Sequence, residues 1–194
     1  MSPPARRALT EAADLRPLPP EAVALLEDLQ APPRLVAHLR AVHDVASQLC
    51  DWLSHHHPQV PVDRAAVSFG AATHDIGKVL HPAELSGPGS SHEPAGHSLL
   101  LAHGIPDHLA RFARTHASWT ADDVTIEDLL VSLADKVWKA KRVPDLEHLV
   151  TAHLATAAGQ EPWEVFLALD DELDRIASGA DARLAFQSSY PITA

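Results

Sequence analysis

The chain has 194 residues, a length that fits one domain with short terminal segments. Its 15 Lys and Arg residues against 26 Asp and Glu residues give a formal charge of −11, which argues against non-specific binding to nucleic acid and to anionic membrane surfaces. No apolar run approaches the ~20 residues that span a bilayer, the first residues lack the apolar core of a secretory signal, and a single cysteine excludes a disulfide framework. We therefore expect a cytoplasmic protein.

The predicted elements are helical along almost the whole chain. The first 20 residues hold five of the 16 prolines and predict a Pro-rich N-terminal tail. Apolar residues then recur at three- and four-residue spacings, and the expected helices cover residues 21–30, 34–56, 62–76, 94–103, 107–115, 125–141, 145–158 and 162–178. A loop rich in Gly and Pro is expected over residues 80–91.

The fold class is all-α, because no stretch alternates with period two for long enough to form a strand. The expected architecture is a compact helical bundle over residues 21–180, followed by a C-terminal tail over residues 181–194. No internal repeat and no linker divides the chain after residue 20.

An adjacent His-Asp pair, His74 and Asp75, lies in a stretch of small and apolar residues. Burying an ionised carboxylate without a partner costs on the order of several kcal/mol, so Asp75 needs a counter-charge. A divalent cation meets this need, because the imidazole supplies a nitrogen ligand and the carboxylate supplies oxygens that can bridge two ions. The alternative is a buried hydrogen bond between the two side chains.

Two further candidates stand on apolar helix faces. Asp is a poor residue for a helix interior, yet Asp135 lies among apolar residues. The alternative, an exposed pair with Lys139 at i,i+4 spacing, fits this face less well. His43 lies on or near the apolar stripe of its helix, where a lone histidine is more often a satisfied core residue than a ligand, and His38 is expected at the surface.

These residues resemble the HD-domain metal-dependent phosphohydrolases, and the resemblance spans roughly residues 35–140. Residues 74–78, His-Asp-Ile-Gly-Lys, match the family's His-Asp-x-Gly-Lys variant. Residues 92–96 resemble the His-x-x-x-Gly element of members that hold two metals, residues 114–116 resemble the next histidine element, and residues 134–136 resemble the closing Ala-Asp-Lys element. The resemblance implies an HD-domain-like helical bundle.

The resemblance also implies a centre with two divalent transition-metal ions and Asp75 as the bridge between them. The implied ligands are His43, His74, Asp75, His92, His116 and Asp135. Four imidazoles and two carboxylates suit Fe, Mn, Co, Ni or Zn better than Ca. His97 is an alternative to His92, which is preferred because Gly96 follows it by four residues, as in the family element.

The basic residues indicate an anionic substrate. The chain has four lysines, Lys78, Lys136, Lys139 and Lys141, and each follows closely on an implied ligand element. Lys78 is the main candidate for a phosphate contact and, with Asp75, for a catalytic role. Arg114, Lys136 and Lys139 are further candidates for substrate binding. For Lys139 and its neighbours, cations that complement a helix C-terminus are the competing explanation.

These features predict a metal-dependent phosphohydrolase that cleaves a phosphomonoester or phosphoanhydride with a metal-activated water, a nucleotide being the expected substrate. A di-iron oxygenase of the same family would use the same ligands, and a non-catalytic module that keeps the metal for stability is the third reading. The expected partner is a small phosphorylated molecule, not a nucleic-acid polymer or a membrane, and assembly into a homo-oligomer stays open. Within the loop over residues 80–91, the glycine-rich stretch 86–90 lies just before His92 and is interpreted as a flap over the site.

Overall fold

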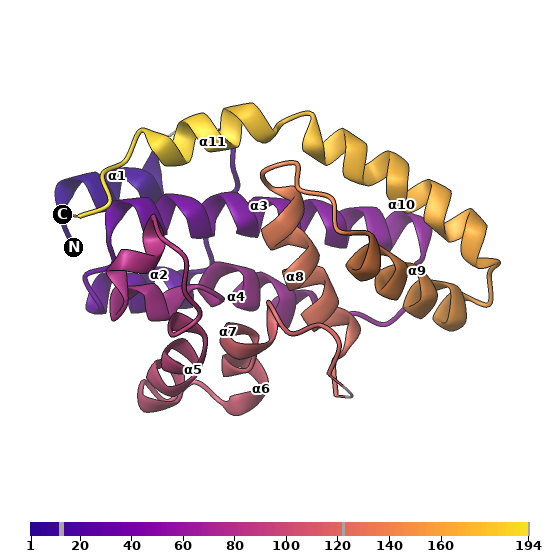
Figure 1. Cartoon of the computed structure of the whole chain (residues 1–194), viewed down its shortest axis with the longest axis horizontal. Helices are drawn as coiled ribbons and strands as arrows, with labels where there is room; N and C mark the ends of the chain where they lie inside the picture. Colours follow the sequence, from indigo (N-terminus) through magenta and orange to yellow (C-terminus); the bar gives the residue numbers. More distant parts are fainter. Residues whose placement is uncertain (12–13, 122, 194) are drawn as a thin grey trace.

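The computed structural model describes residues 1–11, 14–121 and 123–193, and every regular element in these ranges is helical (Figure 1). The elements are α1 (Pro3–Thr10), α2 (Pro20–Asp28), α3 (Pro33–His56), α4 (Arg64–Thr73), the 3₁₀ turns η1 (Ile76–Val79) and η2 (Pro82–Leu85), α5 (His92–Ala102), α6 (Asp107–Ala110), α7 (Phe112–Thr115), α8 (Ile126–Val137), α9 (Pro144–Ala158), α10 (Pro162–Ala177) and α11 (Ala180–Ser188). The prediction of an all-α fold is confirmed. Among the described residues, no helix combines the length and the apolar character that a membrane span requires.

The long helix α3 forms the centre of the bundle. It contacts α1, α4, α8, α10 and α11. Figure 1 shows α10 and α11 along one side of α3 and α4 to α7 on the other. Every residue from 35 to 46 is buried, because neighbouring helices cover this part of α3 on all sides. Polar side chains in this range therefore lie inside the protein and need partners there.

Two helices that position site residues begin at well-defined caps: α4, which ends just before His74, and α8, which carries Asp135. At the start of α4, Asp63 accepts a hydrogen bond from the backbone N–H of Ala66 at 2.9 Å. At the start of α8, Thr125 and Asp128 form the reciprocal capping box that their spacing predicts. Ten of the 12 residues of α8 are buried, so Asp135 lies in a helix that the core surrounds.

The N-terminal segment that the sequence predicts as a tail is packed on α3. Helix α1 buries Ala5 and Ala8 completely. From α3, the buried guanidinium of Arg40 donates hydrogen bonds to the backbone carbonyls of Ala8, Glu11, Leu15 and Arg16. These bonds tie the segment to the bundle.

The C-terminal segment is also packed on the bundle. Helix α11 contacts α3, and Arg34 donates a hydrogen bond to the carbonyl of Tyr190 at 2.8 Å. The Tyr190 ring is 1% exposed and belongs to the same apolar cluster as α1. The packed core thus includes residues on both sides of the expected 21–180 unit.

Candidate metal centre

Six buried histidine and aspartate residues from separate parts of the chain meet between α3, α4, α5, α7 and α8. None is more than 9% exposed. The first group comprises His38, His74 and Asp135, and the second group comprises Asp75, His92 and His116. Within each group, the nitrogen and oxygen atoms that could bind an ion lie within 4.8 Å of one another. We call the six residues the cluster.

Asp75 belongs to the second group and also borders the first, and each of its oxygens faces a different pair of imidazoles. Its Oδ2 lies 3.0 Å from the Nε2 of His38 and 3.6 Å from the Nε2 of His74. Its Oδ1 lies 3.0 Å from the Nε2 of His92 and 3.6 Å from the Nε2 of His116. This arrangement suits a carboxylate that bridges two ions.

Backbone carbonyls orient two of the imidazoles. The Nδ1 of His74 lies 3.0 Å from the carbonyl oxygen of Ala71, and the Nδ1 of His116 lies 3.2 and 3.1 Å from those of Phe112 and Ala113. A carbonyl only accepts hydrogen bonds, so Nδ1 carries the proton in both rings. The Nε2 lone pairs then point into the cluster, where they can bind a metal.

The environment of His38, His116 and Asp75 favours the protonation states that metal binding needs. Burial lowers the pKa of His38 and lowers that of His116 to about 4, so both rings are neutral near pH 7. For Asp75, burial acts against ionisation, but the neighbouring imidazoles of His74, His38 and His92 hold its pKa well below the ordinary value. Neutral imidazoles and ionised carboxylates are the forms that bind divalent ions.

The donors fit a pair of borderline divalent ions. Four imidazole nitrogens and two carboxylates form an N/O set of the kind that Fe, Mn, Co, Ni and Zn accept. The Nε2 of His92 is buried and, among the described residues, has no hydrogen-bond partner of good geometry. A buried nitrogen without a partner is costly, and an ion in the second group would satisfy it.

Two glycines allow the second group to assemble. A Cβ at Gly77 would lie 2.6 Å from the backbone N of Gly96 and 2.8 Å from the carbonyl carbon of His92. A Cβ at Gly96 would in turn lie 3.0 Å from the backbone N of Gly77. Only glycine permits η1 and α5 to approach this closely. The close approach places His92 beside Asp75, which explains the glycine in each of the two motifs.

The model of the HD domain family matches residues 35–138, which is more than half of the chain and includes the whole cluster. The chain belongs to the HD-domain family. Proteins of this family are mostly metal-dependent hydrolases, and HD domains bind divalent metals. Comparisons with curated proteins and with solved structures found no match.

Two lysines of the HD domain reach the carboxylates of the cluster. The Nζ of Lys78 lies 2.5 Å from the Oδ2 of Asp75, and the Nζ of Lys136 lies 2.6 Å from the Oδ2 of Asp135. Their side chains are 18% and 14% exposed, so both amines lie between the cluster and solvent. The Lys136 amine also lies 5.5 Å from the centre of the Trp119 ring.

The structure places His38, and not His43, in the cluster. The Nε2 of His43 lies 2.9 Å from the hydroxyl of Ser68 and outside both groups, so the prediction of His43 as the ligand from this helix is corrected to His38. The expectation that His38 lies at the surface is wrong, since it is 7% exposed. Five residues along a helix correspond to a rotation of about 140°, so the two side chains leave α3 in different directions.

Three other predicted candidates, His97, Arg114 and Lys139, lie outside the cluster. The Nε2 of His97 pairs with Asp107 at 2.8 Å outside the cluster, so the geometry favours His92 over His97. Arg114 is exposed, and none of the described hydrogen bonds or ion pairs joins it to the cluster. Lys139 is exposed, with its amine 5.8 Å from the ring centre of Trp138. Neither residue is brought to the site as Lys78 and Lys136 are.

Sequence reasoning missed Glu84, whose Oε2 lies 2.5 Å from the Nδ1 of His92. No sequence pattern singles out this residue, because it stands in a loop rich in Gly and Pro. For His38, the only signal was its place on the same predicted helix as His43.

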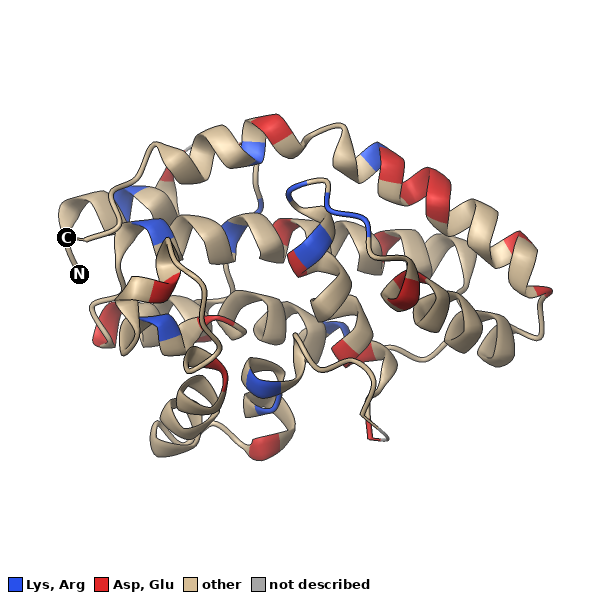
Figure 2. Ribbon diagram, viewed as in Figure 1, with Lys and Arg blue, Asp and Glu red and all other residues tan. Residues whose placement is uncertain are grey.

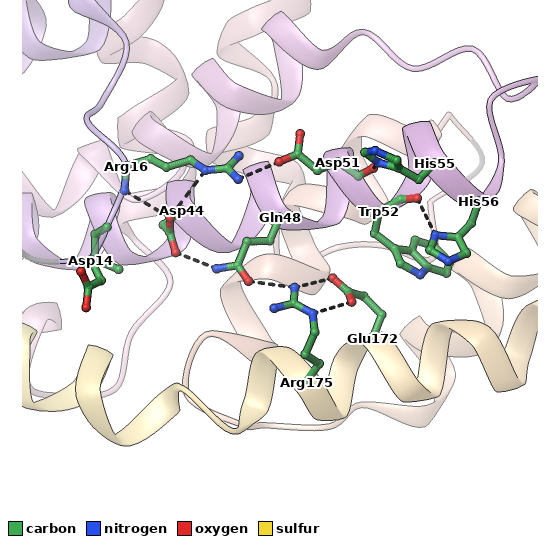
Figure 3. Close-up of a pocket in the computed structure, with 11 residues that line it drawn as sticks. Asp14, Arg16, Asp44, Gln48, Asp51, Trp52, His55, His56, Glu172 and Arg175 are labelled. Carbon is green, nitrogen blue, oxygen red and sulfur yellow. Dashed lines mark hydrogen bonds and ion pairs between the residues drawn. The ribbon is translucent and has the colours of Figure 1, made fainter.

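A cavity of about 700 Å³ lies on another face of α3, between this helix and α10 (Figure 3). Its polar side chains pair with one another: Gln48 donates to Asp44 at 2.8 Å, and Arg175 donates to Gln48 at 2.9 Å and to Glu172. The cavity contains no residue of the cluster. Figure 2 shows acidic residues gathered along α10 on this side of the molecule.

Proposed function

We propose that this HD domain is a phosphohydrolase that releases phosphate from a phosphomonoester or phosphoanhydride, with nucleotides as the first substrates to examine. The observation that carries the proposal is Asp75, whose two oxygens face two groups of metal-binding side chains while the amine of Lys78 contacts the same carboxylate. This combination suits a site that binds two cations and a phosphate.

In this proposal, the first group and Asp75 hold one ion, and the second group holds the other. When bound, the ions would supply Lewis acidity at phosphate oxygens and would lower the pKa of water. The backbone carbonyls behind His74 and His116 keep these rings in one tautomer, so the donor atoms are already oriented before the ions enter.

Lys78 and Lys136 bind and orient the substrate phosphate. Each amine now pairs with a carboxylate of the cluster, and ions on those carboxylates would compete for the same oxygens. The amines are then available for the negative oxygens of a phosphate at the entrance. In a chain of charge −11, two ammonium groups beside this cluster favour an anionic substrate.

The test combines metal analysis with a phosphate-release screen. The purified protein is analysed for bound metal, then assayed with nucleotides and dinucleoside polyphosphates under anaerobic conditions with Mn²⁺ or Co²⁺. Release of phosphate that disappears in Asp75→Asn supports the proposal. Substrate-dependent oxygen uptake without phosphate release would instead identify an oxygenase. Metal binding without turnover in either assay would identify a non-catalytic module.

Lys78→Met tests the role of the lysine. We expect kcat/KM for phosphate release to fall roughly 10- to 100-fold, because a charge-assisted hydrogen bond to phosphate contributes about 1.5–3 kcal/mol. The metal content should not fall, since Lys78 only competes with the ions for Asp75. Lys139→Met, which removes an exposed lysine, is the control. Equal losses of kcat/KM in both variants would contradict the assignment.

A further inference from the structure

Glu84 has three contacts with the start of α5. It lies in η2, within the loop over residues 80–91, and its side chain is only 11% exposed although most of its neighbours in the loop are exposed. Its Oε2 lies 2.5 Å from the Nδ1 of His92 and 3.2 Å from the backbone N of His92. Its Oε1 accepts a hydrogen bond from the backbone N–H of Ser91 at 3.2 Å. One carboxylate thus holds both the side chain and the backbone of His92.

His92 needs this partner because of its position in the fold. The rings of His74 and His116 find carbonyls three or four residues earlier in the chain, at the ends of helices. His92 is the first residue of α5, so no preceding helical turn offers its Nδ1 such a carbonyl. Glu84 supplies the acceptor instead. With its Nδ1 held by Glu84, the ring turns its Nε2 toward the Oδ1 of Asp75 at 3.0 Å, where an ion bound to Asp75 would also meet the Nε2.

The loop is closed around this carboxylate. A Cβ at Gly89 would collide with the carboxylate oxygen of Glu84, so the loop backbone passes directly over it. Glu84 also accepts from the first N–H groups of α5, which have no partner within the helix. The loop before α5 therefore contains the residue that fixes a candidate metal ligand, and Gly89, in the stretch interpreted from sequence as a flap, packs against that residue.

We propose that Glu84 is a positioning residue for the second group, which orients His92 and strengthens its binding of a divalent ion. This inference rests on the metal centre of the proposed function. Carboxylates behind metal-binding histidines typically change metal affinity by 10- to 100-fold. We therefore expect Glu84→Ala to weaken binding of one of two ions by 10- to 100-fold. Binding of the ion held by the first group should change less than twofold.

The test is a metal titration of chelator-treated protein with Mn²⁺ or Zn²⁺, followed by calorimetry and by metal analysis after gel filtration. Glu84→Gln keeps an oxygen acceptor without the charge, so it should weaken binding of the second ion less than Glu84→Ala does. Asp107→Asn is a matched control, because it removes the carboxylate from a His–carboxylate pair outside the cluster, with His97 at 2.8 Å. It should bind both ions as the wild type does.

A second measurement needs no metal. In the metal-free protein, ¹⁵N NMR of the histidine rings should show the Nδ1 of His92 protonated and strongly hydrogen-bonded, and this signature should be lost in Glu84→Ala but partly kept in Glu84→Gln. If Glu84→Ala does not fold, judged by circular dichroism, Glu84→Gln decides the question in both measurements.

The outcomes separate this inference from the proposed function. A wild type that binds no ion would overturn the metal centre itself. A wild type that binds two ions, together with Glu84 variants of unchanged affinity, would overturn only the role of Glu84. Equal weakening of both ions would also overturn it, because it would show a general structural effect.

Discussion

Replacing His38 and His43 of α3 in turn tests which of the two belongs to the metal centre. The Nε2 of His38 lies 3.0 Å from the Oδ2 of Asp75, 3.3 Å from the Nε2 of His74 and 3.7 Å from the Oδ1 of Asp135. His38→Ala removes one of the two imidazoles of the first group and leaves His74 and Asp135, with Asp75 beside them, as its donors. We expect the affinity for one ion to fall at least 100-fold, because removing a ligand should cost no less than the largest effects of residues behind the ligands. A 100-fold loss corresponds to about 2.7 kcal/mol.

His43→Ala should instead reduce the stability of the protein and leave its metal affinity unchanged. It removes a buried imidazole and its hydrogen bond to Ser68, so we expect a loss of about 2–4 kcal/mol in unfolding free energy. Its metal affinity should stay within twofold of the wild type, because His43 lies outside both groups.

The assay is calorimetric titration of the metal-free variants with Mn²⁺ or Zn²⁺, together with urea unfolding. Because the His38 ring packs 4.9 Å from that of Trp138, His38→Gln is a second variant that retains more of the packing volume. Loss of an ion in His43→Ala, with both ions retained in the His38 variants, would refute the assignment and restore the ligand predicted from sequence.

Three further predictions concern stability. Burial lowers the pKa of His43 from 6.5 to about 4, so the unfolded chain binds a proton there that the folded protein does not. In the metal-free protein, this residue alone should therefore lower the unfolding free energy by about 3 kcal/mol between pH 6.5 and pH 4. Urea unfolding of His43→Gln should lack this part of the loss; identical pH profiles would contradict it. Gly77→Ala should lower the unfolding free energy by roughly 1–3 kcal/mol and weaken binding of the second ion, because its Cβ would meet the α5 backbone. Gly87→Ala should lower the unfolding free energy less, because its Cβ would lie 3.2 Å from a single carbonyl oxygen. Equal unfolding free energies for the two would argue against the close approach. Arg40→Met should lower the unfolding free energy by on the order of 3–5 kcal/mol, because it leaves backbone carbonyls unpaired. Proteases should then cut within residues 8–16 faster than in the wild type, and cleavage at the wild-type rate would refute this prediction.

Much of the fold follows from local patterns. Three- and four-residue spacing of apolar side chains identifies the helices, and a capping box such as that of Thr125 and Asp128 is complete within four residues. The local sequence is also enough to select the His74–Asp75 pair and Asp135 as candidates. A charged residue in an apolar stretch will be buried, and a buried charge needs a partner in any fold. The family motifs added His92 and His116, and the structure brings both to the cluster.

The choice between His38 and His43 required the tertiary structure. Periodicity distinguishes a buried face from an exposed one, but residues 35–46 of α3 are buried on every side, so both histidines satisfy the pattern. Only the packing of α4 and α8 against α3 decides which ring meets Asp75 and Asp135. The same holds for Glu84 and for the terminal segments. Their partners are residues distant in sequence or backbone groups. Many such pairings are compatible with the sequence, and only the folded chain brings one of them together.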